Sequence, residues 1–163
     1  MRKVIVNATP LIILCHIGQL DLLKKLYTKI IIPQAVYQEV CAKHDSACQQ
    51  VNDNLDWIQV CVVSHPAERK MYQAKLHAGE VEVMILAREM NADLLVIDDK
   101  AAKKTAKYLG FTVTGTLGVL LRAKRMGVVQ EVRPLLQAIR KNGFYVSATV
   151  ANMVLTASGE ECG

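Results

Sequence analysis

Short apolar runs alternate with longer helix-patterned segments along the whole chain. These runs are Val4–Val6, Ile30–Ile32, Trp57–Val63, Leu94–Ile97 and Phe111–Thr114. Strands of about four residues with so few polar positions are typical of a parallel sheet that is buried on both faces. Because helical segments separate them, the sequence predicts a three-layer α/β fold with a mainly parallel central sheet flanked by helices.

The segments between these runs are expected to be helical. We expect helices at residues 11–26 with a break at Gly18, 34–43, 80–90, 100–109, 116–126, 131–141 and 148–157. The polar stretch 45–56 fits either a helix or a loop. No repeat or linker is present, so residues 1–163 are expected to form a single domain, with the last helices (about 131–157) as a C-terminal extension.

The composition narrows the class of protein. The chain is 52% hydrophobic and 21% charged, which is typical of a soluble globular protein and excludes a disordered one. No apolar run reaches the roughly 18–20 residues that a membrane helix needs. The run Val4–Val6 is too short for a signal peptide, so we expect a cytoplasmic protein.

Five cysteines are present, and no two of them form a CxxC pair. An odd number cannot pair completely within one chain, so reduced thiols in a cytoplasmic protein are the simplest expectation. Cys41, His44 and Cys48 lie close together in the sequence, as some zinc ligands do. No second group with ligand spacing follows, so a zinc site is the less favoured interpretation.

Positive charge is concentrated in the last part of the chain. Up to Ile97, ten Lys and Arg residues balance ten Asp and Glu residues; from Asp98 onward there are ten basic residues and five acidic ones. A basic surface of this kind attracts phosphate backbones and acidic partners. A solvated helix face whose lysines serve solubility is an equally good interpretation.

Polar residues follow three of the expected strands. Asn7 follows the first strand, Asp98 and Asp99 follow the fourth, and Gly115 and Thr116 follow the fifth. In open parallel sheets, ligands bind beyond the carboxyl ends of the strands. Two adjacent carboxylates repel each other unless a cation or a helix N-terminus compensates. A helix cap would explain one of the two aspartates but not both, so we expect a metal site here.

The sequence lacks the motifs that define several common kinds of functional site. The chain has no GxGxxG and no GxxxxGK[ST] loop, which excludes the usual dinucleotide and P-loop sites. The four histidines share no spacing with partners for a catalytic triad. Aromatic residues make up 5% of the chain and are scattered, so no stacking platform for single-stranded bases is evident.

Several segments, in order along the chain, together resemble the PIN-domain nucleases. They read VIVNATPLIIL, IIPQAVYQEV, GEVEVMILA, LLVIDDKAAKKTAKYLG and VTGTLGVLLRAKRMG. Within that superfamily they are most similar to a prokaryotic branch that resembles VapC-type toxins. The resemblance runs from the first strand to about Phe144 and therefore covers most of the chain.

The resemblance implies a metal-dependent endoribonuclease that cleaves RNA phosphodiester bonds by metal-activated water, with Mg²⁺ or Mn²⁺ as cofactor. Position by position, the family's first-strand acid falls on Asn7, its helical acids fall on Glu39 and Glu80, and its last acid falls on Asp99, with Asp98 beside it. The resemblance implies that all five are catalytic residues and that the metal ligands are Asn7, Glu80, Asp98 and Asp99. Glu39 and Glu80 are assigned by the resemblance alone, because an acid near a helix start is favoured by the helix dipole whatever its function.

The resemblance also implies partners and a nucleic-acid surface. The expected partners are RNA, a small antitoxin protein if the chain is the toxin of a toxin–antitoxin pair, and a second copy of the chain in a homodimer; no membrane is expected. The residues expected to contact nucleic acid are Thr9, Lys100, Lys103, Lys104, Thr116, Arg122, Lys124 and Arg125.

Asn7 departs from the family pattern, in which most active nucleases carry Asp at this position. A neutral amide oxygen can still ligate a cation, but the site has one negative charge fewer. The alternative is therefore a catalytically weak or inactive PIN-like module that binds RNA or a partner protein. A small-molecule hydrolase or nucleotide-binding protein on the same sheet is a third, less favoured class.

Overall fold

The computed structural model describes residues 2–43, 45–72 and 76–160. Within these residues, five strands form one parallel sheet in the order β3-β2-β1-β4-β5. The strands are β1 (Val4–Val6), β2 (Ile30–Pro33), β3 (Ile58–Cys61), β4 (Leu94–Val96) and β5 (Val113–Thr114). Every residue of β1, β2 and β4 is buried, which explains their uniformly apolar sequences.

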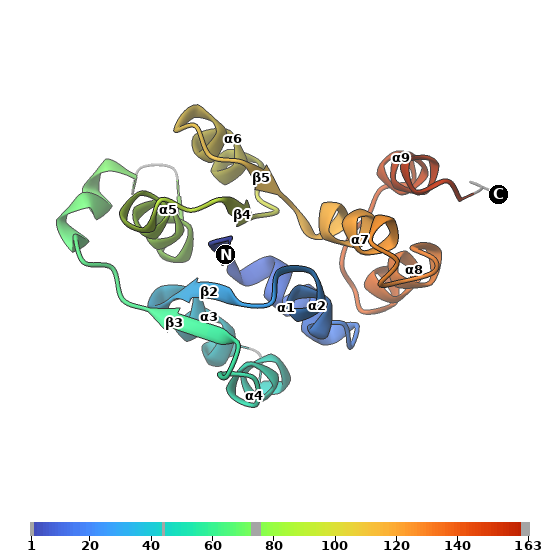
Figure 1. The fold of residues 1–163 in the computed structure, drawn as a ribbon, viewed down its shortest axis with the longest axis horizontal. Coiled ribbons are helices and arrows are strands. Elements are labelled where there is room, and N and C mark those ends of the chain that lie inside the picture. Colours follow the sequence, from blue (N-terminus) through green and yellow to red (C-terminus); the bar gives the residue numbers. More distant parts are fainter. Residues whose placement is uncertain (1, 44, 73–75, 161–163) are drawn as a thin grey trace.

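Helices flank this sheet (Figure 1). Helix α5 contacts β1 and β2 and packs on α3, whereas α2 contacts β2 and packs on α7. The expected three-layer α/β architecture is therefore confirmed. The helices are α1 (Ala8–His16), α2 (Asp21–Tyr27), α3 (Gln34–Lys43), α4 (Asp45–Asn52), the 3₁₀ helix η1 (Pro66–Met71), α5 (Ala78–Met90), α6 (Lys100–Tyr108), α7 (Thr116–Arg125), α8 (Arg133–Lys141) and α9 (Ala148–Ser158).

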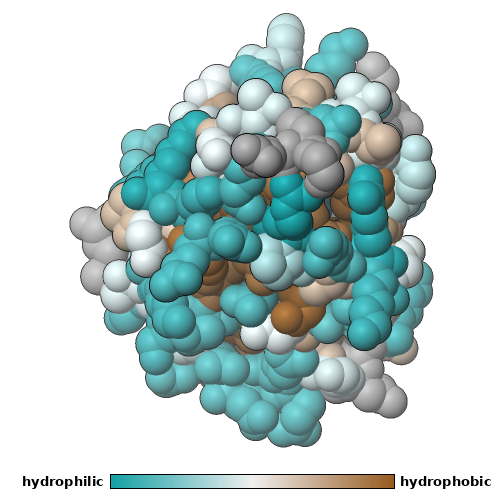
Figure 2. All heavy atoms as spheres, turned by 90° about the vertical axis from the view of Figure 1, so that its right-hand side faces the viewer, coloured by the Kyte–Doolittle hydropathy of each residue, from teal (hydrophilic) through white to brown (hydrophobic). Residues whose placement is uncertain are grey.

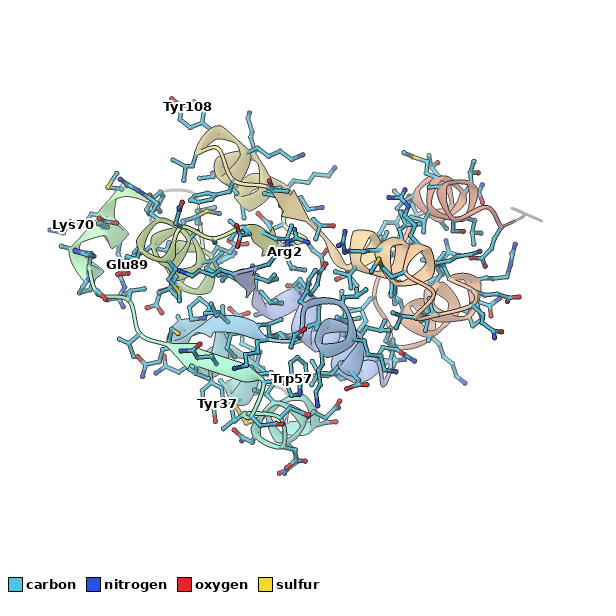
Figure 3. The ribbon with its side chains drawn as sticks, in the orientation of Figure 1. Arg2, Tyr37, Trp57, Lys70, Glu89 and Tyr108 are labelled. Carbon is cyan, nitrogen blue, oxygen red and sulfur yellow. A yellow bond between two sulfur atoms is a disulfide. The ribbon has the colours of Figure 1, made fainter. Side chains whose placement is uncertain are left out.

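The third strand is shorter than the run Trp57–Val63 predicts. It ends at Cys61, and Val62 is 65% exposed. Cys61 pairs with Pro33, the last residue of its neighbour β2, and α3 begins directly afterwards, so the edge strand has no partner beyond Cys61. The Ser64 backbone N–H then donates to the carboxylate of Glu89, which lies on α5 beside η1 (Figure 3). The length of the neighbouring strand therefore limits this one, and the apolar run alone could not indicate this.

The structure shows where the expected helix 11–26 is interrupted and whether the stretch 45–56 is helical. The expected helix over 11–26 is two helices, because Gly18 between them adopts a left-handed conformation with φ 68°. The stretch that fitted either a helix or a loop begins with α4 and therefore forms a helix up to Asn52.

The expectation that all cysteines are reduced is wrong for one pair. Cys41 on α3 and Cys48 on α4 form a disulfide with an S–S distance of 2.11 Å. Their Cα atoms are 4.6 Å apart because α3 and α4 pack against each other. Two sulfurs in a disulfide are not thiolate ligands, which argues against the zinc interpretation; His44 and Cys162 lie outside the described residues.

The C-terminal helices are joined by one carboxylate. Glu160 accepts hydrogen bonds from the backbone N–H groups of Val132 at 2.8 Å and Arg133 at 3.0 Å, where α8 begins. It also accepts from Lys124 Nζ on α7 at 2.9 Å and from the Ser158 hydroxyl at 3.0 Å. The face that carries these helices is mostly hydrophilic, with hydrophobic atoms visible in recesses between polar ones (Figure 2).

Glu160 is expected to stabilise the protein only above acidic pH. Burial raises the pKa of this carboxyl, but the hydrogen bonds from Val132, Lys124, Arg133 and Ser158 outweigh burial and lower the pKa to about 2. Since the unfolded chain has the ordinary value of 4.5, the stabilisation is complete above that pH and is lost as the pH falls towards 2.

We therefore expect Glu160→Gln to lower the free energy of unfolding by about 2 kcal/mol at neutral pH, with the difference from the wild type shrinking in acid. Chemical denaturation at neutral pH and near pH 3 measures this. Glu131→Gln is the matched control, because Glu131 directly precedes Val132, which donates to Glu160, and is itself exposed. A Glu160→Gln difference that is independent of pH would contradict the assignment.

Candidate functional site

The end of β1 lies beside the end of β4. Val6 is in register with Val96, and the Asn7 backbone N–H donates to the Val96 carbonyl at 3.0 Å. Both strands run in the same direction, so the residues after them emerge at the same carboxyl edge of the sheet. The expected proximity of Asn7 to the segment that carries Asp98 and Asp99 is therefore confirmed at the level of the backbone.

Two helices bring further groups to Asn7. Gly79, in the first turn of α5, is buried, and a Cβ atom built on it would lie 3.6 Å from Asn7 Oδ1 and 3.8 Å from Glu39 Oε1. The same Cβ would lie 3.3 Å from a methyl group of Val36 on α3. A residue without a side chain therefore allows α5 to approach α3 closely here. This approach places the Glu39 carboxylate near the amide of Asn7.

Glu80 is a buried acid at the same place. It is 6% exposed, and its Oε1 atom accepts a hydrogen bond from the His77 backbone N–H at 3.0 Å, which closes the first turn of α5. Burial raises the pKa of Glu80; the negative charges of Asp99 and Glu39 raise it further, while the His77 backbone N–H and the charge of His77 act in the opposite direction. The negative charges of Asp99 and Glu39 therefore both act on Glu80.

Asp98 and Asp99 each cap a helix. Asp99 Oδ2 accepts from the Ala102 backbone N–H at 2.9 Å, at the start of α6. Asp98 Oδ1 accepts from the Thr116 backbone N–H at 2.7 Å, and its Oδ2 accepts from the Thr116 hydroxyl at 2.6 Å, at the start of α7. Helix capping therefore explains the presence of both aspartates, whereas the sequence suggested that it could explain only one of them.

These donors suit a hard divalent cation by their chemistry. Asn7 supplies an amide oxygen, and Glu39, Glu80 and Asp99 supply carboxylates, the ligands that Mg²⁺ and Mn²⁺ prefer. Among the described residues, no group of three or more His, Cys, Asp or Glu side chains is close enough together to hold a metal ion by itself. Mg²⁺ keeps several of its waters and needs only a few protein ligands, so an open arrangement of this kind fits it.

The residues expected to contact nucleic acid divide into two groups. Thr9, Lys100, Lys103 and Thr116 line one pocket of about 510 Å³ together with Asp98. Lys104 is an exposed residue of the same helix α6. The structure thus brings Lys100 and Lys103 to the carboxyl edge of the sheet, beside Asp98. Asn7, Glu39, Glu80 and Asp99 are called the acidic group below.

The basic residues of α7 lie elsewhere. Arg122 and Arg125 line a cavity of about 440 Å³ together with Arg2, which precedes β1, and Leu94, the first residue of β4. This cavity is at the amino edge of the sheet, because α7 begins at the carboxyl edge and runs back across it. Lys124 Nζ is held by Glu160. The structure does not bring these three side chains to the acidic group.

Two aromatic residues at the site were not predicted from the sequence. Phe144 and Tyr145 line the same pocket as Asp98, although 135 residues separate Phe144 from Thr9 in the chain. The expectation that no stacking platform exists was based on how the aromatic residues are scattered in the sequence. No local signal could have found them, because the fold alone brings residues 144 and 145 next to α1 and α6.

Comparison with known proteins identifies the family. A family model described as PIN domain matches residues 3–160, which is nearly the whole chain. No curated protein matches closely enough to be named as a relative. Within the described residues, no helix combines the length and the apolar character that crossing a membrane requires. The matched range includes Asn7, Glu39, Glu80 and Asp99. Because the match covers nearly the whole chain, the chain belongs to the PIN-domain family, whose members are generally nucleases.

Proposed function

We propose that this protein is a metal-dependent endoribonuclease that uses Mg²⁺ or Mn²⁺. The observation that supports the proposal is that Asn7 Oδ1 and Glu39 Oε1 both lie beside Gly79 in the first turn of α5, where the negative charges of Glu39 and Asp99 act on the buried Glu80. Lys100 and Lys103 of α6 line the pocket that contains Asp98. The carboxylates would attract a divalent ion, and the lysine ammonium groups would attract the negatively charged phosphodiester of the RNA. Both kinds of group are needed for metal-dependent cleavage of RNA.

Asn7, Glu39, Glu80 and Asp99 would hold the ion, and a bound ion would supply an activated water and stabilise charge on the phosphate oxygens. Asp98 has a different role, because both of its oxygens bind Thr116. It is a positioning residue that fixes the start of α7 relative to the end of β4. Lys103 Nζ and Asp98 Oδ1 lie 2.9 Å and 2.6 Å from the position of a Cβ on Gly115, so this glycine leaves room for both.

Thr9, Lys100 and Lys103 would bind the RNA backbone. Thr9 is exposed in the first turn of α1 and lines the pocket of Asp98 as well as a smaller one that contains Glu39. Its hydroxyl can donate to a phosphate oxygen. The ammonium groups of Lys100 and Lys103 contribute charge that is independent of RNA sequence.

Removing the metal is expected to abolish cleavage. The full chain, incubated with single-stranded RNA and either Mg²⁺ or Mn²⁺, should give internal cleavage products that EDTA prevents and that added Mn²⁺ restores. Gel separation of end-labelled RNA measures this. Cleavage that is unaffected by EDTA after exhaustive dialysis would contradict a metal-dependent mechanism.

A second candidate is a PIN-like module that binds RNA without cleaving it. Two observations favour it: Asn7 stands where most active members carry Asp, and the described acids are not gathered into a ready cluster. This candidate predicts RNA binding that weakens with salt and does not depend on divalent ions. The toxin role, a small antitoxin, a homodimer and a cytoplasmic location stay predictions from the sequence and the resemblance.

A further inference from the structure

The pocket next to Asp98 has a polar wall and an apolar wall. Asp98, Lys100, Lys103 and Thr116 form the polar wall. The apolar wall comes from α1, α7 and the C-terminal segment, and it consists of Ile13, Leu117, Ile139, Phe144, Val146 and Val150, with Tyr145 beside them. At about 510 Å³ the pocket is within the size range of small-molecule sites. A phosphate alone would not need the apolar half.

Phe144 is one of the aromatic residues that line this pocket. Its ring meets His16 of α1 edge to face, with the ring centroids 5.7 Å apart, and its backbone N–H donates to the Ile139 carbonyl at 3.2 Å. Phe144 also lines the smaller pocket that contains Glu39 and Lys43. Phe144 therefore lines both the pocket that contains Asp98 and the one that contains Glu39.

Tyr145 is 90% exposed, although it lines the pocket. The backbone after it is well anchored: Arg140 donates to the Val146 carbonyl from Nε at 3.1 Å and from Nη2 at 2.9 Å. Ser147 then caps α9 by accepting from the Val150 backbone N–H at 3.1 Å. Tyr145 therefore presents a large, exposed ring beside the pocket, on a backbone segment that these hydrogen bonds anchor.

We propose that this pocket binds one unpaired nucleobase of single-stranded RNA, stacked on Tyr145 beside Phe144, with the adjoining phosphate held by Lys100 and Lys103. The proposal rests on the proposed RNA substrate and adds a subsite for one of its bases, built by the C-terminal segment of this chain. Every nucleobase has a face that can stack on an aromatic ring, so this contact selects for an unpaired nucleotide and not for a base sequence.

Duplex RNA does not fit this arrangement. In an A-form helix the bases stay stacked within the duplex, and proteins reach mainly the backbone and the shallow minor groove. Only a loop, a bulge or a single strand can place a base against Tyr145 while its phosphate reaches Lys103. Single-stranded RNA should therefore bind more tightly than a duplex of the same length.

Tyr145→Ala is expected to weaken binding of a short single-stranded RNA by about 5- to 100-fold, the effect of losing one stacked base. Fluorescence anisotropy with labelled RNA in EDTA measures binding without cleavage. Tyr145→Phe keeps the ring and should bind as the wild type does. The slope of log affinity against log salt should not change in Tyr145→Ala, whereas Lys103→Gln should reduce it by about 0.7 for one lost phosphate contact.

Tyr108→Ala is the matched control. Tyr108 is 89% exposed and ends the basic helix α6. It lies at the top of Figure 3, far from the C-terminal helices at the right. It should leave binding unchanged. Equal loss in Tyr108→Ala and Tyr145→Ala, or an equal loss for duplex and single-stranded RNA, would overturn the base pocket.

The same set of variants separates this inference from the proposed function. Metal-dependent cleavage together with unaltered binding by Tyr145→Ala overturns the base pocket and leaves the nuclease. Tyr145-dependent binding of single strands without cleavage at any metal concentration supports the base pocket and overturns the nuclease. A melting temperature close to that of the wild type shows that Tyr145→Ala folds, as the exposure of Tyr145 leads us to expect.

Discussion

Asp99→Asn is expected to lower the rate of RNA cleavage by at least about 100-fold in Mg²⁺ or Mn²⁺, the size of effect that loss of one critical electrostatic group produces. The change removes one negative charge from the group formed by Asn7, Glu39, Glu80 and Asp99. It leaves the cap of α6 in place, because an Asn oxygen accepts from the Ala102 N–H as well as an Asp oxygen does. Single-turnover cleavage of end-labelled RNA measures the rate.

Thermal unfolding without metal distinguishes a chemical effect of this change from a structural one. The melting temperature of Asp99→Asn should stay close to that of the wild type, since the cap is kept. Asp21→Asn is the control, because Asp21 is an exposed carboxylate at the start of α2 and lies outside the acidic group. Full activity in Asp99→Asn would show that Asp99 is not a metal ligand, and would contradict the proposed metal site.

Asn7→Asp is expected to raise the affinity for Mn²⁺ and the cleavage rate by about 10- to 100-fold each, because an additional charged ligand tightens a divalent site. Asn7 is only 5% exposed and lies near Glu39. A carboxylate there would be buried beside other carboxylates, so the protein without metal should lose stability. Added Mn²⁺ should restore it, so the metal-induced rise in melting temperature should exceed that of the wild type.

Isothermal titration, cleavage assays and thermal unfolding with and without Mn²⁺ test the three parts of this prediction. Asn91→Asp makes the same change at an exposed position, the left-handed C-cap at the opposite end of α5. It should alter neither Mn²⁺ affinity nor cleavage, and any loss of stability from the added charge at this helix end should not depend on Mn²⁺. Tighter Mn²⁺ binding without any cleavage would favour the non-catalytic module. Unchanged Mn²⁺ affinity would show that the side chain of Asn7 does not take part in metal binding.

The strands and the place of the site were predictable because their signals are local. Fully apolar runs of three or four residues indicate buried parallel strands, and the polar residue after such a strand must emerge at its carboxyl end. Asn7 and Asp98 could therefore be assigned to one edge of the sheet before any coordinates were known. The pairing of β1 with β4 confirms that assignment.

The roles of Glu39 and Glu80 were not predictable from spacing. Their positions depend on how closely α3 and α5 approach at Gly79, and that approach is a property of packing. The cap that Asp98 provides was missed for a similar reason, since its partner Thr116 is 18 residues away. The family resemblance supplied the two glutamates, and only the structure showed what each acid contacts.

The sequence by itself determined the α/β class, the carboxyl edge as the place of the polar residues and the excess of positive charge after Asp98. Only the tertiary structure decided that Arg122 and Arg125 face the amino edge, that Cys41 pairs with Cys48, and that Phe144 and Tyr145 form an aromatic wall beside Asp98. The physical reason is range: periodicity and apolar runs act over a few residues, whereas these contacts depend on how whole helices pack.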